Sequence, residues 1–371
     1  MSAARPLVSV IVRSMARPSL AAALASIARQ EGIVAEVLVI AAVGAAHPPP
    51  GDACGPHALR LVGSYTPLSR PAAANAGLDA ATGDWITFLD DDDIFLPGHL
   101  AGLLAARTDA PDAGVIHSYA RAVFADGRVE RFGQPFSLMQ LFDRSFIHLS
   151  TALVAGGHVA AGARFDESLE IHEDWDFFLQ LAQQARFQFV PHETFEWHAD
   201  AGTSGAAGGA NHDDARFAMV RDRVYAKWLG PRDALIDAVA AKLRSAVEHA
   251  QRRDLAGAEA LARDALAGSP NDPWALNTLA MVQRVAGRLA DARATQALAV
   301  AVRPQDAAFV YNLALLCRAL GDTAAARACC GRALTLAPEF APARLLRDEL
   351  ASATSGERHR ASESTIDMST R

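Results

Sequence analysis

Short apolar runs alternate with helical patterns in the first 90 residues of the chain. Periodic segments at Arg17–Gln30 and Ala72–Ala81 predict helices. The predicted strands are Leu7–Val12, Glu36–Ile40, Ala58–Val62 and Trp85–Leu89. Strands that alternate with helices favour a largely parallel sheet covered on both faces, so we expect ligands beyond the carboxyl ends of the strands.

Two further patterns complete the predicted elements. Val115–Phe124 and Arg128–Phe132 flank an Asp-Gly pair, which predicts a β-hairpin. From about Asp237 the chain becomes rich in alanine and helical, and Pro270, Pro304 and Pro338 lie 34 residues apart. Gly287 and Gly321 keep the same interval. An ordinary helical bundle is the alternative, but it would not hold one interval through so many positions.

Composition narrows the class of protein. The length of 371 residues indicates two domains. Half of the residues are hydrophobic, which indicates a packed rather than a disordered protein. The net charge of −7 comes without a basic cluster, so nucleic acid is not an expected partner. Cysteines 54, 317, 329 and 330 form no C-x-x-C pair and predict a reducing compartment. We expect a cytoplasmic protein, with the inner face of the membrane as an alternative location.

Four consecutive acids, Asp90 to Asp93, follow the predicted strand Trp85–Leu89. Adjacent carboxylates repel one another unless a cation or a network of donors offsets their charge. Oxygen-rich clusters favour Mg²⁺ or Mn²⁺, which can bridge the oxygens of a diphosphate. A solvated acidic loop is the alternative interpretation.

With its flanks, this segment resembles the family 2 glycosyltransferases of the GT-A fold. The similar motif runs from Arg70 through Asn75, Gly77 and Gly83-Asp84-Trp85 to the four acids and Pro97. The likeness extends from Leu7 to Trp228, including Arg13 and Glu173-Asp174-Trp175. It implies an α/β GT-A domain at 1–228, and the 34-residue period resembles tetratricopeptide repeats at 229–350. The polar residues 351–371 are expected to form a disordered tail.

The resemblance implies an inverting enzyme that moves a sugar from a nucleoside diphosphate sugar, a UDP-sugar by first expectation. It places the metal, Mn²⁺ or Mg²⁺, on Asp92, with Asp90 and Asp91 near the ribose or the metal. It also implies that Arg70 and Asn75 line the donor site, although Asn75 could instead cap its helix. The acceptor implied is a glycan, a lipid-linked glycan or a protein, in the biosynthesis of a polysaccharide.

Inverting transfer also needs a carboxylate that takes the acceptor's proton. Glu173 and Asp174 begin a predicted helix, whose N-terminus favours ionised carboxylates. The resemblance implies that Asp174 is the base, with Glu173 or Asp176 as alternatives. It also implies that His198 lies near the metal, although a surface histidine is equally common. The Gly-rich residues 202–209 are expected to form a loop that orders with the donor.

The sequence departs from the family pattern at two positions. Ala42 stands where relatives carry an Asp that contacts the nucleotide base, and Arg13 stands where a Pro is common. Arg13 could reach a phosphate or pair with a nearby acid. Two hypotheses follow: an active glycosyltransferase whose repeats bind acceptor or partner, or a catalytically weak or inactive scaffold whose repeats bind a peptide or protein partner.

Overall fold

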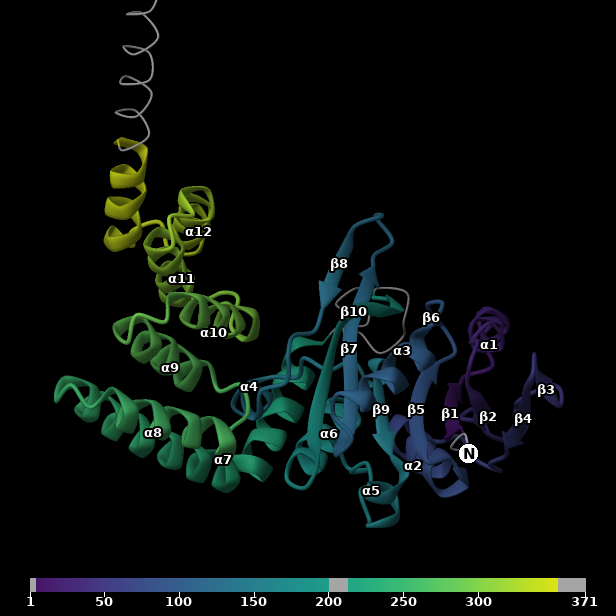
Figure 1. Cartoon of the computed structure of the whole chain (residues 1–371). Coiled ribbons are helices and arrows are strands. Elements are labelled where there is room, and N and C mark those ends of the chain that lie inside the picture. The colour runs from purple at the N-terminus through teal and green to yellow at the C-terminus, as the bar shows by residue number, and fades with distance from the viewer. Residues whose placement is uncertain (1–4, 200–212, 353–371) are drawn as a thin grey trace, which may run out of the picture. The chain divides into compact units, whose positions relative to one another are not determined.

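A computed structural model describes residues 5–199 and 213–352 of the chain (Figure 1). Two compact units make up the chain. The first comprises Met1–Phe136 and Leu141–Arg232, and the second comprises Ser137–Gln140 and Asp233–Arg371. The boundary falls within a single long helix, α7, which runs over Asp214–Gln251.

A ten-stranded mixed sheet forms the first unit, in the order β3-β4-β2-β1-β5-β9-β7-β10-β6 with β8 beside β7. β4, β2, β1 and β5 are mutually parallel, whereas β9 is antiparallel to both of its neighbours. The strands are β1 Leu7–Ser14, β2 Val34–Ala41, β3 Ala53–Cys54, β4 His57–Val62, β5 Trp85–Asp90, β6 Ile94–Phe95, β7 Ala113–Val123, β8 Val129–Phe132, β9 Ala152–Ala155 and β10 Arg186–His198.

Helices connect the strands of this unit and bury their apolar faces against the sheet. The helices are α1 Leu20–Ala28, α2 Arg70–Ala80, α3 His99–Ala105, α5 Gly156–Ala160 and α6 Glu173–Ala182. A further helix, α4 Leu138–Asp143, contains residues of both units. Short 3-10 turns lie at Gly44–Ala46 (η1), Ala106–Thr108 (η2) and Leu149–Thr151 (η3). The predicted α/β fold class is therefore confirmed, as is the hairpin of β7 and β8. The sheet is mixed rather than largely parallel, because β3, β6, β8 and β9 pair antiparallel to their neighbours.

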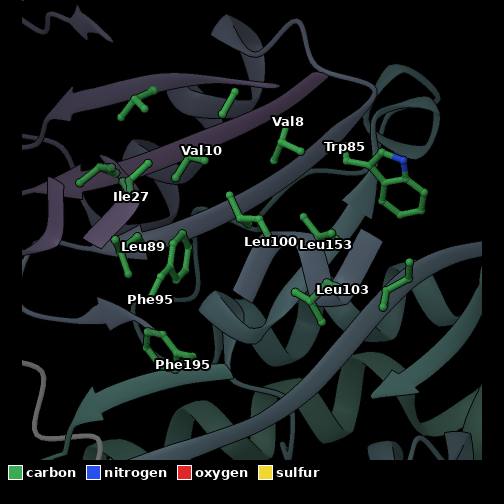
Figure 2. Close-up of a cluster of buried hydrophobic side chains, with 14 of the residues drawn as sticks. Val8, Val10, Ile27, Trp85, Leu89, Phe95, Leu100, Leu103, Leu153 and Phe195 are labelled. Atoms are coloured by element: carbon green, nitrogen blue, oxygen red, sulfur yellow. The ribbon is translucent and has the colours of Figure 1, made fainter. Parts of the chain in front are cut away.

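The core between the sheet and its helices is made of alternate strand residues. Figure 2 shows Val8 and Val10 of β1 together with Leu89, Phe95 and Phe195, all of which are buried. Val8 and Val10 are two residues apart and share one face of the strand. Packing on this face fixes the register between β1 and β5, in which Arg13 lies beside Asp90. The acidic segment is thereby held at the carboxyl edge of the parallel strands.

The helices of the second unit recur at the interval read from the sequence. α8 (Leu255–Gly268), α10 (Leu289–Val302) and α12 (Thr323–Leu336) begin 34 residues apart. α9 (Pro273–Val285) and α11 (Ala307–Ala319) lie between them and keep the same spacing. The small residues of this period are buried: Ala258, Ala265, Ala292, Ala299, Ala326 and Ala333. Within the described ranges, no helix is both long and apolar enough to span a bilayer.

Residues from Asp237 onward are expected to fold in isolation, because each helix packs against the helices next to it in the sequence. The clusters around Val310 and Cys317 consist wholly of residues from this part of the chain. The purified fragment should show a helical circular dichroism spectrum and one cooperative melting transition. A fragment without helical signal would show that the unit depends on the sheet domain for its structure.

Candidate active site

A cavity of about 800 Å³ opens at the carboxyl edge of the sheet, within the first unit. Loops that follow β1, β2 and β5 contribute to its wall, together with the N-terminus of α6 and the end of β10. Its lining includes most of the residues expected from the sequence to act in the reaction: Arg13, Arg70, Asp90, Asp92, Glu173, Asp174 and His198.

Arg13 links the two acidic segments of the cavity. Its Nε and Nη2 atoms donate to the two carboxylate oxygens of Asp90 at 2.7 and 2.9 Å, and its Nη1 donates to Glu173 at 3.2 Å. Burial acts to raise the pKa of Asp90, but Arg13 and then Arg70 outweigh it and lower that pKa to about 2. Of the two roles considered for Arg13, the structure shows the pairing with acids.

Asp91 points away from the cavity and holds the loop that follows β1. Its side chain is fully buried and accepts hydrogen bonds from the Ser14 hydroxyl and the Met15 backbone nitrogen, at 3.1 and 2.7 Å. Arg17 pairs with it at 2.6 Å. Asp91 was expected near the ribose of the sugar donor or the metal, but it does not line the cavity.

Asp90, Asp92 and Asp93 form the group that could hold a cation. Each offers one carboxylate oxygen, and these three atoms lie within 4.8 Å of one another. Burial and the neighbouring carboxylates raise the pKa of Asp92, and they raise the pKa of Asp93 well above its usual range. A bound cation would relieve this repulsion, and a ligand set of oxygens suits Mg²⁺ or Mn²⁺.

His198 differs from the expected metal ligand. Its Nδ1 lies 2.8 Å from the backbone oxygen of Asp92, and its backbone nitrogen donates to Asp93 at 3.1 Å. Its Nε2 lies 3.7 Å from Glu196. The side chain thus lines the cavity beside the acidic segment, and the three-oxygen group contains Asp93 rather than His198. A role of His198 as a metal ligand stays a prediction.

The formal charges of the cavity lining leave room for one divalent cation. Its acids are Asp90, Asp92, Asp93, Glu170, Glu173 and Asp174, and its guanidinium groups are Arg13, Arg17, Arg70 and Arg216. When all of these groups are ionised, the lining carries two more negative than positive charges, and one Mg²⁺ or Mn²⁺ would neutralise this excess. The donor chemistry and the charge balance of the cavity therefore both fit such an ion.

Asp174 combines access to the cavity with an unusual acidity. It occupies the first turn of α6, lines the cavity and is partly buried. Burial, reinforced by the charge of Glu173, raises its pKa to about 6, although Arg70 and Arg13 act in the opposite direction. The helix N-terminus was expected to favour the ionised form, but the cost of burial outweighs that effect. A carboxylate with this pKa is well suited to accept a proton near neutral pH.

Glu173, the neighbouring acid, forms ion pairs with two arginines. Only 2% of its side chain is exposed, and it pairs with Arg13 and Arg70, each at 3.2 Å. Asp176, the other alternative base, is fully buried and pairs with Lys227 and the indole nitrogen of Trp228. Asp174 is therefore the acid of this helix that is best placed to meet a substrate.

The rate of the reaction should follow the ionisation of Asp174. Below its pKa of about 6 the protonated carboxyl cannot accept a proton, so kcat/KM should fall roughly tenfold for each pH unit and should level off above pH ~7. A bound cation would shift the midpoint to lower pH. Initial rates at saturating Mn²⁺ between pH 4.5 and 8.5 would measure the profile. A rate that rose as the pH fell would contradict this assignment.

The Asn-Ala-Gly segment of the family-like motif has a structural role. Ser69, not Asn75, caps α2, and the Asn75 side chain pairs with the backbone of Phe165 at 2.9 and 3.0 Å. Asn75 is absent from the cavity lining. A Cβ on Gly77 would stand 2.3 Å from Ile11 of β1, so glycine is needed for the helix to pack on the strand. Asn75 was expected in the donor site and instead ties α2 to the Phe165 loop.

Some residues of the cavity had no signal in the sequence. His148 precedes η3, and Phe132 and Trp197 come from β8 and β10, so only the fold brings them to the acidic cluster. Ala42 lines the cavity without a carboxylate, as the sequence indicated. The Gly-rich residues 202–209, expected to form a closing loop, lie outside the described residues.

Comparison with known proteins agrees with this geometry. The sequence model of the family described as Glycosyl transferase family 2 matches residues 68–165, which include α2 and the four acids. The chain is 29% identical to the succinoglycan biosynthesis protein ExoO of Rhizobium meliloti over 300 residues, 72% of this chain and 81% of that protein. It is 33% identical to the amylovoran biosynthesis glycosyltransferase AmsB of Erwinia amylovora over 36% of this chain and 47% of that one.

Among solved structures, residues 1–349 of S. aureus TarS in complex with UDP-GlcNAc align with a TM-score of 0.45 and 16% identity, covering 68% of this chain and 89% of that one. The family match and the sequence relatives, taken with the mixed sheet and the acid-lined cavity, lead to one conclusion. Residues 68–165 of the chain match glycosyl transferase family 2, and the chain is a glycosyltransferase.

Proposed function

We propose that the sheet domain transfers a sugar from a nucleoside diphosphate sugar to a hydroxyl group of a growing polysaccharide, with inversion at the anomeric carbon. The observation that carries this proposal is the joint presence, in one cavity, of a three-carboxylate group suited to a cation and of Asp174 with its raised pKa. The two groups supply the two halves of such a reaction, which are departure of the diphosphate and activation of the acceptor.

Asp90, Asp92 and Asp93 would hold Mn²⁺ or Mg²⁺ at the end of β5. A divalent cation bound there would neutralise the charge that develops on the departing diphosphate. Arg70 is 41% exposed on the cavity wall, where it pairs with Glu173 at 3.2 Å and more loosely with Asp90 at 3.7 Å. It can therefore turn towards a phosphate oxygen while Arg13 keeps the acids in place. This division of roles assigns Arg70, rather than Arg13, to the donor.

Asp174 would accept the proton of the acceptor hydroxyl. The hydroxyl oxygen then forms a bond with the anomeric carbon from the face opposite the leaving group, and the bond from that carbon to the diphosphate oxygen breaks. The bonding electrons leave with the diphosphate, so the configuration at carbon is inverted. Glu173 would orient Arg13 and Arg70 and would not itself take the proton, because both guanidinium groups already neutralise it.

The nucleotide and the acceptor are proposed from different grounds. A UDP-sugar is the first candidate for the donor, although Ala42 removes the carboxylate that would otherwise contact the base. The names of the relatives, which refer to the biosynthesis of succinoglycan and amylovoran, support a polysaccharide as the product. We assign the reaction to residues 1–228, and we assign binding of the acceptor or a protein partner to tetratricopeptide-like repeats at 229–350.

A thermal-shift panel tests the proposed function. UDP, GDP, ADP and TDP would each be measured with and without Mn²⁺, since a ligand that binds the native state alone raises the melting temperature. At about 100 times the dissociation constant, the stabilisation amounts to ~2.7 kcal/mol. At least one nucleotide should give a shift that requires Mn²⁺. If none did, the donor assignment would be wrong, and a scaffold with a vestigial cavity would be the better interpretation.

A further inference from the structure

One side of the cavity is aromatic rather than acidic and has no role in the transfer described above. Trp197 at the end of β10 packs edge-on against Phe132 of β8, with ring centroids 5.9 Å apart. His148 is a second neighbour of this indole, with its ring centroid 5.2 Å from that of Trp197. All three residues line the cavity, and Trp197 and His148 are only partly buried. The indole is therefore available to a molecule in the cavity.

Local hydrogen bonding fixes the orientation and the tautomer of His148. Its Nδ1 accepts a hydrogen bond from the backbone nitrogen of Ser150 at 3.2 Å, so the ring proton resides on Nε2. Phe195 packs on the ring at 4.7 Å. Burial lowers the pKa of His148 to about 4, which keeps the ring uncharged at neutral pH. No described residue accepts a hydrogen bond from Nε2, which leaves a neutral donor at the cavity wall.

The order of the strands places this aromatic side opposite the nucleoside side. β5 carries the acids that would hold the diphosphate, with β1 and β2 on one side of it and β9, β7 and β10 on the other. Ala42, which follows β2 and lines the cavity, stands where the family resemblance implies contact with the nucleotide base, so the nucleoside of a donor held at its diphosphate would extend from β5 towards β2. The acceptor must then approach from the side of β9, β7 and β10, where Trp197 and His148 lie.

We propose that Trp197 and His148 form a subsite for a sugar ring of the acceptor. The indole face would pack on the C–H face of a pyranose, and the Nε2–H of His148 would donate a hydrogen bond to one of its hydroxyl oxygens. A pyranose has an apolar face and a polar rim, and it therefore matches an aromatic plane beside a neutral donor. This inference rests on the proposed function and identifies the acceptor, at the point of transfer, as a glycan.

Saturation-transfer NMR on the full chain with simple sugars tests the subsite. The probes are methyl β-D-glucopyranoside, methyl β-D-galactopyranoside and methyl α-D-mannopyranoside, with cyclohexanol as a non-sugar reference, each with and without UDP and Mn²⁺. At least one glycoside should receive saturation, mainly at the ring protons of one face. Trp197→Ala should reduce that transfer about fivefold or more, and Trp197→Phe should retain part of it. Tyr65→Ala, which removes an aromatic ring of the sheet domain that is 98% exposed and absent from the cavity lining, should not change it.

The outcomes separate this inference from the proposed function. If UDP with Mn²⁺ binds while no glycoside receives saturation, or if Trp197→Ala keeps the full signal, the subsite is wrong and the donor assignment stands. If a glycoside binds through Trp197 and no nucleotide binds, the subsite stands and the donor assignment fails. A signal that is lost in Tyr65→Ala would place the sugar outside the cavity and overturn the inference. His148→Ala should also weaken the transfer to that glycoside, because it removes the Nε2–H donor, and an unchanged signal would exclude His148 from the subsite.

Discussion

Replacement of Asp174 by Asn should lower turnover by about 10²- to 10⁴-fold, the usual range for loss of a general base. The amide keeps the size of the side chain but cannot accept the proton of the acceptor hydroxyl. Binding of the nucleotide with Mn²⁺ should change little, because the carboxylates that would hold the cation lie on a different segment, after β5. Turnover and nucleotide affinity, measured on the same preparation, would separate the two effects.

Glu173→Gln is the matched control for this variant. It alters the adjacent acid of the same helix turn and leaves Asp174 free to act as the base. Because Glu173 neutralises Arg13 and Arg70, its loss should lower the pKa of Asp174 and shift the pH profile of kcat/KM towards lower pH. An inactive Glu173→Gln beside an active Asp174→Asn would identify Glu173 as the base. Full activity of both would exclude any inverting mechanism that uses these two acids.

The architecture was predictable from the sequence because it depends on periodic patterns. Each strand of the parallel core was expected within two residues of its observed ends, since buried parallel strands are continuous apolar runs. The 34-residue interval located the paired helices for the same reason: the small residues that allow helices to touch recur with the fold. The antiparallel insertion of β9 between β5 and β7 was not predicted, because Ala152–Ala155 is too short to give a pattern.

The sequence predicted which acidic segments form the site, but not which residues their side chains pair with. The sequence placed acids at the end of β5 and at the start of α6, and both segments line the cavity. It could not show that Arg13 pairs with Glu173, which is 160 residues later in the sequence, because this pair depends on the packing of α6 against the sheet. The raised pKa of Asp174 was missed for the same reason, since burial is a property of the assembled cavity. His148 and Trp197 carried no motif at all.

Asp92→Ala is expected to abolish binding of Mn²⁺ together with the nucleotide while leaving the fold intact. Asp92 contributes one of three clustered oxygens, and the pKa of its carboxyl is already raised by burial and by Asp90. Its removal takes away repulsion within the cluster, so the melting temperature without metal should stay the same or rise. Isothermal titration of UDP in the presence of Mn²⁺ would measure the loss of binding, and differential scanning calorimetry would measure the stability.

Asp91→Ala provides the contrasting variant, one residue away. Asp91 is fully buried and accepts hydrogen bonds from Ser14 and Met15, so its loss leaves buried donors without a partner. That should cost about 1–3 kcal/mol of stability. If Asp92 is a cation ligand and Asp91 holds the loop after β1, the two variants should differ. Asp92→Ala should lose Mn²⁺ binding at normal stability, whereas Asp91→Ala should lose stability. If nucleotide binding still required Mn²⁺ in Asp92→Ala, the cation would have to be assigned to Asp90 and Asp93 instead. If both variants were equally destabilised, Asp92 would have a structural role in the cavity wall.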